Sequence, residues 1–138
     1  MPLFYADASA LVKLVRDEAE SAALRSYLHG AELVTSDLVL TEIPRAVRRA
    51  AALTPELQLD VLLQRTAALI DAVALRPCDG TLLAAAGALD EPMLRALDAI
   101  HVATAIDVYP VDAFITYDER QAAAARLAGL STVAPGPT

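Results

Sequence analysis

The stretch Leu3-Phe4-Tyr5-Ala6-Asp7-Ala8-Ser9 decides how the rest of the chain is arranged. Its first four residues are apolar or aromatic and predict a short buried strand that ends just before Asp7. Ser9 is expected to cap the helix that follows. In open α/β sheets, ligand sites form beyond the carboxyl ends of the strands, so Asp7 is expected to stand at the entrance of such a site.

Short apolar runs alternate with helical stretches along the rest of the chain. Strands are expected at 3–6, 32–35, 73–76, 113–117 and 131–133, and helices after Ser9 and at 18–28, 37–52, 55–73, 79–89, 93–107 and 119–128. This order predicts an α/β fold of three layers, in which helices flank both faces of a short parallel central sheet. We found no internal repeat or linker, so one domain over residues 1–138 is expected, with a loose tail from about residue 134.

Composition limits the classes to which the protein can belong. Hydrophobic residues make up 56% of the chain, yet the longest apolar stretch, residues 80–89, is far shorter than the roughly 20 residues of a membrane span. No signal peptide is recognisable and the single cysteine, Cys78, has no internal partner, so a cytoplasmic protein is expected. The net charge of −7 argues against binding of nucleic acid through overall positive charge, but it is compatible with a metal-dependent nuclease.

Four acids are candidates for one site. Asp7 and Asp118 follow apolar strands, whereas Glu42 and Asp98 lie within helices among apolar neighbours. If the two strands are parallel neighbours, their acids reach the same edge of the sheet, and acids on buried helix faces require a partner or a metal ion. Three of the four also have a simpler interpretation: Asp7 starts a helix, Asp118 occupies a turn, and Glu42 pairs with Arg45. Taken together, hard oxygen ligands of this kind suit Mg²⁺ or Mn²⁺ and metal-assisted phosphoryl transfer.

Other polar residues are candidates for supporting roles. Ser9 and Thr116 each lie two residues from an acid, where a hydroxyl can bind a carboxylate or phosphate, or can simply cap a helix or end a strand. His101 follows Asp98 by three residues and can share a metal with it, although a core histidine with both ring nitrogens satisfied is the simpler interpretation. The candidates for phosphate contact, for which a solvated helix face is the alternative, are Arg45, Arg48, Arg49 and Arg120.

Four motifs, in this order, resemble those of PIN-domain ribonucleases. They are Asp7-Ala8-Ser9-Ala10-Leu11-Val12-Lys13, Leu40-Thr41-Glu42-Ile43, the stretch LRALDAIHVATA at 94–105, and Phe114-Ile115-Thr116-Tyr117-Asp118. The nearest branch is the VapC toxins of bacterial toxin–antitoxin pairs, which are stand-alone PIN domains of about this length. The resemblance implies a PIN-like three-layer α/β/α fold and an endoribonuclease that depends on Mg²⁺, with Mn²⁺ as a substitute.

The resemblance also implies roles for the candidate residues and a set of partners. Asp7 and Asp98 would hold the metal, with Glu42 and Asp118 contributing directly or through water. The family hydrolyses RNA with metal-activated water and leaves 5′-phosphate and 3′-hydroxyl ends. Expected partners are RNA, a cognate VapB-type antitoxin whose C-terminal segment lies across the groove, and a second copy in a homodimer and toxin–antitoxin hetero-oligomer, without a membrane. The polar positions beside the site correspond to Ser9 and Thr116.

Two other classes of function stay open. An aspartate-dependent phosphotransfer enzyme would also place Asp7 after the first strand, but dehalogenase-type phosphatases have a second Asp two residues later, where this chain has Ser9. A receiver domain requires a lysine after a late strand, whereas the only lysine here is Lys13. A non-catalytic α/β binding module, whose acids only satisfy arginines, would neither bind a metal nor turn over RNA.

Overall fold

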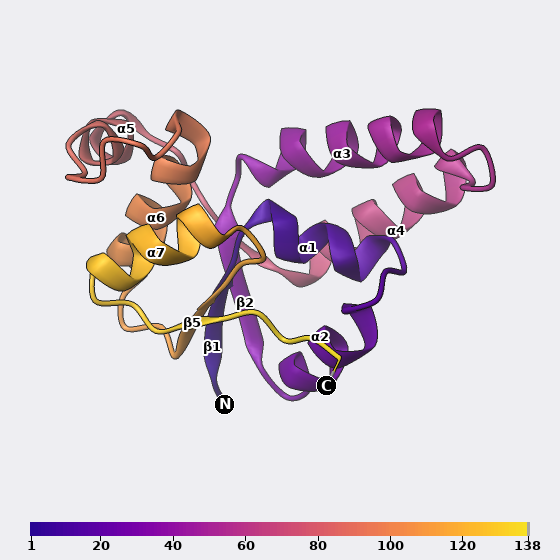
Figure 1. Ribbon diagram of the computed structural model, residues 1–138, viewed down its shortest axis with the longest axis horizontal. Coiled ribbons are helices and arrows are strands. Elements are labelled where there is room, and N and C mark those ends of the chain that lie inside the picture. The colour runs from indigo at the N-terminus through magenta and orange to yellow at the C-terminus, as the bar shows by residue number, and fades with distance from the viewer. Residues whose placement is uncertain (138) are drawn as a thin grey trace.

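The computed structural model describes residues 1–137, which form one parallel sheet between two layers of helices (Figure 1). The strands are β1 (Leu3–Ala6), β2 (Glu32–Ser36), β3 (Ala74–Arg76), β4 (Ala113–Ile115) and β5 (Thr132–Val133). The helices are α1 (Ala8–Val15), α2 (Ser21–Leu28), α3 (Val39–Leu53), α4 (Leu59–Ala72), α5 (Gly80–Gly87), α6 (Ala96–Val108) and α7 (Glu119–Leu127). The predicted three-layer α/β fold is confirmed. None of the helices within residues 1–137 has the length and apolar character to span a membrane.

Strand β1 lies in the middle of the sheet, where the direction of strand addition reverses. The sheet order is β3-β2-β1-β4-β5, and all neighbouring strands are parallel. The chain first moves outward from β1 to β3 and then returns to β4 on the other side of β1. In such a sheet, a ligand crevice lies beyond the strand ends at the reversal. Asp7 stands there, and its backbone N–H donates to Ile115 O of β4 at 3.2 Å.

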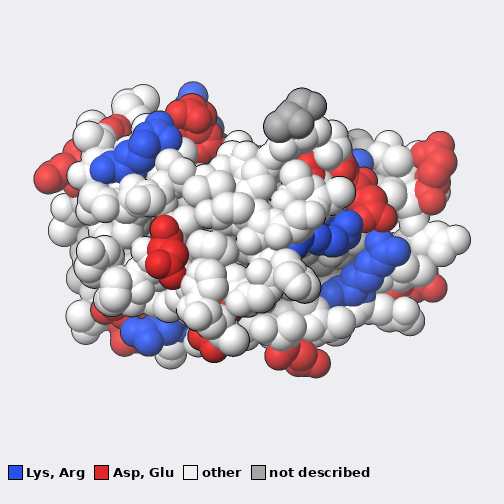
Figure 2. All heavy atoms as spheres, turned by 90° about the horizontal axis from the view of Figure 1, so that it is seen from below, with Lys and Arg blue, Asp and Glu red and all other residues white. Residues whose placement is uncertain are grey.

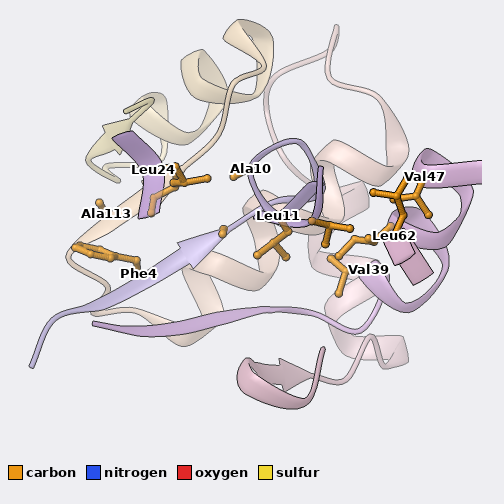
Figure 3. Close-up of a cluster of buried hydrophobic side chains, with 12 residues drawn as sticks. Phe4, Ala10, Leu11, Leu24, Val39, Val47, Leu62 and Ala113 are labelled. Atoms are coloured by element: carbon orange, nitrogen blue, oxygen red, sulfur yellow. The ribbon is translucent and has the colours of Figure 1, made fainter. Parts of the chain in front are cut away.

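The alternation of side chains along β1 divides the apolar core between the two faces of the sheet. Phe4 faces the α1, α3 and α4 side, where it belongs to the same cluster as Leu11 and Val39 (Figure 3). Tyr5 faces the α6 and α7 side and stacks on Phe114, with 5.2 Å between the ring centroids. Because both faces are buried, the strand must be apolar throughout, which explains the composition of the opening stretch.

Two predicted helix caps are wrong. Asp7, not Ser9, caps α1: its side chain accepts from Ala10 N at 3.0 Å, and Ser9 lies inside the first turn. The helix expected over 37–52, for which Ser36 or Asp37 is the cap that the sequence predicts, begins at Val39 without a side-chain cap. The Asp37 side chain instead accepts from the backbone of Cys78, which the fold brings from beyond β3. The carboxylates of Asp7 and Asp37 therefore accept from the backbone N–H groups that the fold brings next to them. Local sequence alone does not show which N–H groups these are.

The start of α4 also differs from the prediction. The Thr54-Pro55 pair is a typical helix start, but α4 begins at Leu59. Thr54 instead closes α3, because its N–H donates to Ala50 O at 2.9 Å. Leu57 N then donates to Thr54 O at 3.0 Å, so the intervening residues form a turn.

Two further boundaries near the site are corrected. The helix expected from residue 93 begins at Ala96, since Leu94 N donates to Glu91 O in a turn. The strand expected to reach residue 117 ends at Ile115, so two residues separate it from Asp118. The tail predicted to be loose starts at residue 134, and its last residue, Thr138, lies outside the described residues. Within the described part, the Tyr117 hydroxyl donates to Pro135 O.

Candidate active site

Asp7 is held by donors from the first turn of α1 and from the end of β4. Oδ1 accepts from Ser9 Oγ at 2.7 Å and from Ala10 N at 3.0 Å, and Oδ2 accepts from Thr116 Oγ1. Asp7 is only 3% exposed. Burial raises the pKa of its carboxyl, and the hydrogen bonds from Thr116 and Ser9 counteract part of that rise. A carboxylate oxygen has two lone pairs, so Oδ2 retains one for a further ligand.

Thr116 and Asp118 form a short hydrogen-bonded unit at the end of β4. The Thr116 hydroxyl donates to Asp7 and accepts from Asp118 N at 3.0 Å. Asp118 Oδ1 accepts from the backbone N–H groups of Arg120 and Gln121, so it caps α7. The predicted turn position of Asp118 is therefore a helix N-cap. This cap leaves Oδ2 of the same carboxylate available to the site.

Asp98 lies in the first turn of α6, and the other three acids affect the pKa of its carboxyl. Burial raises the pKa of its carboxyl, and the negative charges of Asp118, Asp7 and Glu42 raise it further. Asp118, Asp7 and Glu42, from three other segments, thus each contribute negative charge that acts on Asp98. Among residues 1–137, however, no three His, Cys, Asp or Glu side chains stand close enough to enclose a metal ion. The acids share one edge of the sheet without forming a closed ligand shell.

Asp118→Asn should lower the pKa of Asp98, because it removes the largest charge effect on that carboxyl. Asn is as good an N-cap as Asp, so α7 should keep its start. The measurement is an NMR titration of the Asp98 side-chain carboxyl carbon in metal-free buffer. Asp90→Asn, which changes an exposed acid outside this group, is the matched control and should leave the titration unchanged. An unaltered Asp98 pKa in Asp118→Asn would mean that the two carboxylates are not neighbours.

Glu42 is bound to His101 and not to Arg45 in the described part of the chain. Glu42 Oε1 lies 2.7 Å from His101 Nε2, and His101 Nδ1 lies 2.7 Å from the Tyr5 hydroxyl. The His101 side chain is 1% exposed, whereas that of Glu42 is 20% exposed. The simpler interpretation of His101, a core histidine with both nitrogens satisfied, is confirmed. The predicted alternative of a Glu42–Arg45 pair is wrong, because the carboxylate turns inward to the ring.

A groove of about 590 Å³ opens beside Glu42. Ser9 and Glu42 lie on its wall, together with Arg45 and Arg49 from α3, whereas Arg48 does not. Arg120 lines a separate hollow of about 340 Å³ with Asp98 and Asp118. The remaining residues on the wall of the groove are Ala8, Val12, Lys13, Glu18, Thr41, Ala46, Leu97 and Tyr117. The candidate site therefore spans two adjoining hollows, and each contains both acids and arginine.

Two residues at the site were not predicted. Lys13 lines the groove one turn after Ser9, with its Nζ 2.9 Å from Glu20 and 4.8 Å from the centre of the Tyr117 ring. Its spacing of four residues from Ser9 was the available signal. Gln121 is buried and donates through Nε2 to Asp98 O at 3.1 Å. No local pattern indicates that role, because it depends on α7 lying beside α6.

Comparison with known proteins gives four findings. Residues 4–127 match the family described as PIN domain. The chain is similar to ribonuclease VapC35 of Mycobacterium tuberculosis, with 39% identity over 140 residues that cover 97% of this chain and 98% of that protein. Its fold resembles the crystal structure of VapC20 of the same species, a sarcin-ricin loop cleaving toxin, with a TM-score of 0.71, 18% identity and coverage of 96% and 99%. It also resembles VapBC2 from Rickettsia felis, bound to a DNA fragment from their promoter, with a TM-score of 0.69, 11% identity and coverage of 96% and 98%.

Proposed function

The chain belongs to the PIN-domain family, and from its full-length similarity to a VapC ribonuclease we propose that it is the toxin of a toxin–antitoxin pair and an endoribonuclease. The observation that carries this proposal is the group of interacting acids around Asp98 at the carboxyl edge of β1 and β4. In the reaction, water adds to phosphorus and the bond from phosphorus to the 3′ oxygen breaks. The products are a 5′-phosphate and a 3′-hydroxyl, which takes up a proton.

The donor atoms of the site fit Mg²⁺, with Mn²⁺ as a substitute. Both ions prefer oxygen ligands, and a cation relieves the repulsion from neighbouring acids that adds to the effect of burial in raising the pKa of Asp98. Asp7 and Asp98 would hold the ion, with Glu42 and Asp118 contributing directly or through water. When bound, the ion would lower the pKa of a water molecule that it holds and would neutralise the negative charge that develops on the phosphate.

The residues around the acids have distinct tasks in this proposal. Ser9 and Thr116 donate to Asp7, so they orient the carboxylate and favour its ionised form despite burial. Glu42 lines the groove and reaches solvent, and we assign to its second oxygen the proton of the attacking water. Asp118 orients water beside Asp98.

Phosphate binding is assigned to the arginines on the wall of the groove. The chain carries a net charge of −7, and on the face drawn in Figure 2 basic and acidic side chains lie in small groups around a largely uncharged centre. RNA must therefore be held by a local basic surface. Lys13 is paired with Glu18 and Glu20, so Arg45 and Arg49 carry this contact. Arg120, beside Asp98 and Asp118, is assigned to the scissile phosphate.

Replacing both Arg45 and Arg49 by Gln should raise the KM for RNA several-fold with little change in kcat. Each lost phosphate contact should also reduce the slope of log KM against log salt concentration, by about 0.7 per arginine when the RNA is single-stranded. Steady-state cleavage at several salt concentrations measures both quantities. Arg48→Gln is the matched control, because Arg48 belongs to the same helix but does not line the groove. An equal effect of Arg48→Gln would contradict the assignment.

The proposed partners are those of a toxin. We assign the groove to RNA and, in the inactive complex, to the C-terminal segment of a cognate VapB-type antitoxin. Leu40 and Leu97, near Glu42 and Asp98 in sequence, are 48% and 50% exposed and provide apolar contact for such a segment. We propose that the chain forms a homodimer within a toxin–antitoxin hetero-oligomer. Cellular RNA as the substrate places the proposed activity in the cytoplasm.

The proposed function is tested by analysis of cleavage products. Purified protein is incubated with a structured RNA and Mg²⁺, and the ends of the fragments are identified. We expect 5′-phosphate ends that accept ligation and 3′-hydroxyl ends that accept tailing without prior phosphatase treatment. Cyclic 2′,3′-phosphate ends would contradict the reaction, and hydrolysis of small phosphate esters without RNA cleavage would favour a phosphotransfer enzyme.

A further inference from the structure

A chain of three hydrogen-bonded side chains links the elements that carry Asp7, Asp98 and Glu42. The Tyr5 hydroxyl lies 2.7 Å from His101 Nδ1, and His101 Nε2 lies 2.7 Å from Glu42 Oε1. Tyr5 belongs to β1, two residues before Asp7, and His101 belongs to α6, three residues after Asp98. Glu42, on α3, is therefore tied to both elements that hold the proposed metal-binding aspartates.

The acceptor at the end of this chain fixes the positions of its protons. The Glu42 carboxylate can only accept, so His101 Nε2 carries the hydrogen. In the neutral ring, Nδ1 then has a lone pair and accepts from the Tyr5 hydroxyl. The Tyr5 phenol carries one O–H hydrogen, which points along this 2.7 Å contact and makes Tyr5 the donor. Tyr5 thus selects the tautomer of His101 that presents an N–H group to Glu42.

Packing does not by itself fix the carboxylate of Glu42. Helix α3 packs most extensively on α4 and α1, whereas His101 belongs to α6 on the other face of the sheet. The glutamate side chain has three rotatable bonds, and Arg45 follows it on the same helix face. The bond to His101 opposes that attraction and holds Oε1 on the side of the acids. Oε2 is then left toward the groove.

We infer that His101 is a positioning residue that orients Glu42 for metal binding or for activation of water, with Tyr5 fixing its tautomer. This inference rests on the proposed function, because it concerns the orientation of one of the proposed site acids. Side chains that orient metal ligands from behind affect metal affinity or activity by about 10- to 100-fold when they are removed. The same scale is expected here.

His101→Asn and His101→Gln form a matched pair that tests the inference. The amide nitrogen of Gln can replace ring Nε2 and donate to Glu42, whereas the shorter Asn side chain reaches only the position of Nδ1. Two quantities are measured: Mn²⁺ affinity without RNA, from the electron paramagnetic resonance signal of free Mn²⁺, and kcat for RNA cleavage at saturating Mn²⁺. Glu42→Gln first shows which of the two quantities depends on Glu42. His101→Asn should lower that same quantity by about 10-fold. His101→Gln should retain most of the wild-type value.

Further variants separate positioning from a structural role. Tyr5→Phe keeps the ring that stacks on Phe114 and removes only the hydroxyl, so a smaller loss in the same direction is expected. Thr66→Val removes a buried hydroxyl that donates to Leu62 O within α4, remote from the acids, and should leave both quantities unchanged. The Tm of each variant shows whether it is folded.

The double variant Glu42→Gln with His101→Asn decides the outcome. If His101 acts through Glu42, the double variant should be no worse than Glu42→Gln alone. Additive losses, or wild-type Mn²⁺ affinity and kcat in folded His101→Asn, would overturn the inference. If His101→Asn does not fold, unchanged values in Tyr5→Phe overturn it. Wild-type cleavage by both Asp7→Asn and Glu42→Gln would instead refute the proposed function.

Discussion

Asp7→Asn is expected to lower the rate of RNA cleavage by about 100-fold or more without unfolding the chain. A bound metal contributes several kcal/mol to such reactions, and each 1.36 kcal/mol is a factor of ten. Asn cannot supply the negative charge that the ion requires. Its amide oxygen can still accept from Ser9 and Ala10, and its amide nitrogen can donate to Thr116, so the local geometry is preserved.

The stability of Asp7→Asn follows from the pKa of the buried carboxyl. Burial raises that pKa in the folded state, so ionised Asp7 reduces the free energy of unfolding above the ordinary carboxyl pKa. The contribution of Asp7 to stability is full below its unfolded pKa and is lost as pH rises through the folded value. In metal-free buffer at neutral pH, the Tm of Asp7→Asn should therefore equal or exceed that of the wild type. The difference should shrink as the pH falls toward the ordinary carboxyl pKa.

Asp79→Asn is the matched control for this variant. Asp79 caps α5 as Asp7 caps α1, accepting from Leu82 N at 2.9 Å, but it is exposed and lies outside the group of acids. Its substitution should leave cleavage unchanged. Cleavage by Asp7→Asn at the wild-type rate would contradict the assignment of Asp7 to the site. A large loss of Tm in that variant would show that the carboxylate is structural.

Chelation of divalent ions should abolish cleavage, and Mg²⁺ or Mn²⁺ in excess should restore it. The ion should also stabilise the folded chain, because at 100 times its dissociation constant a ligand adds about 2.7 kcal/mol to the free energy of unfolding. Thermal unfolding in EDTA and in Mn²⁺ measures this effect. Because the pKa of Asp98 is raised, the ion competes with a proton, and its stabilising effect should increase as pH rises through that pKa.

Asp98→Asn distinguishes this site from adventitious binding. The variant should lose both cleavage and most of the Mn²⁺-dependent rise in Tm. Asp90→Asn, at an exposed position of the loop before α6, should keep both. Cleavage that persists in excess EDTA would exclude the proposed metal-dependent reaction.

Local sequence patterns were sufficient for most of the fold. The apolar run at Leu3–Ala6 and the later short strands predicted a parallel sheet, and Asp79 was correctly expected at the start of α5. The errors lie at boundaries where distant backbone competes for a donor or acceptor. Thr54 closes α3 instead of opening α4, and Asp37 serves Cys78 instead of α3. The residues next to Thr54 and Asp37 in the sequence do not predict either hydrogen bond.

The sequence by itself determined which residues are chemically unusual: acids at strand ends and on apolar helix faces, in the order of the PIN-domain motifs. Only the tertiary structure decided their partners. Asp7 is bound by Thr116, 109 residues away, and Tyr5 by His101, 96 residues away. Hydrophobic periodicity is set by successive residues and can be read locally. Hydrogen-bond partners at the site are set by the reversal of strand order at β1, which only the folded chain specifies.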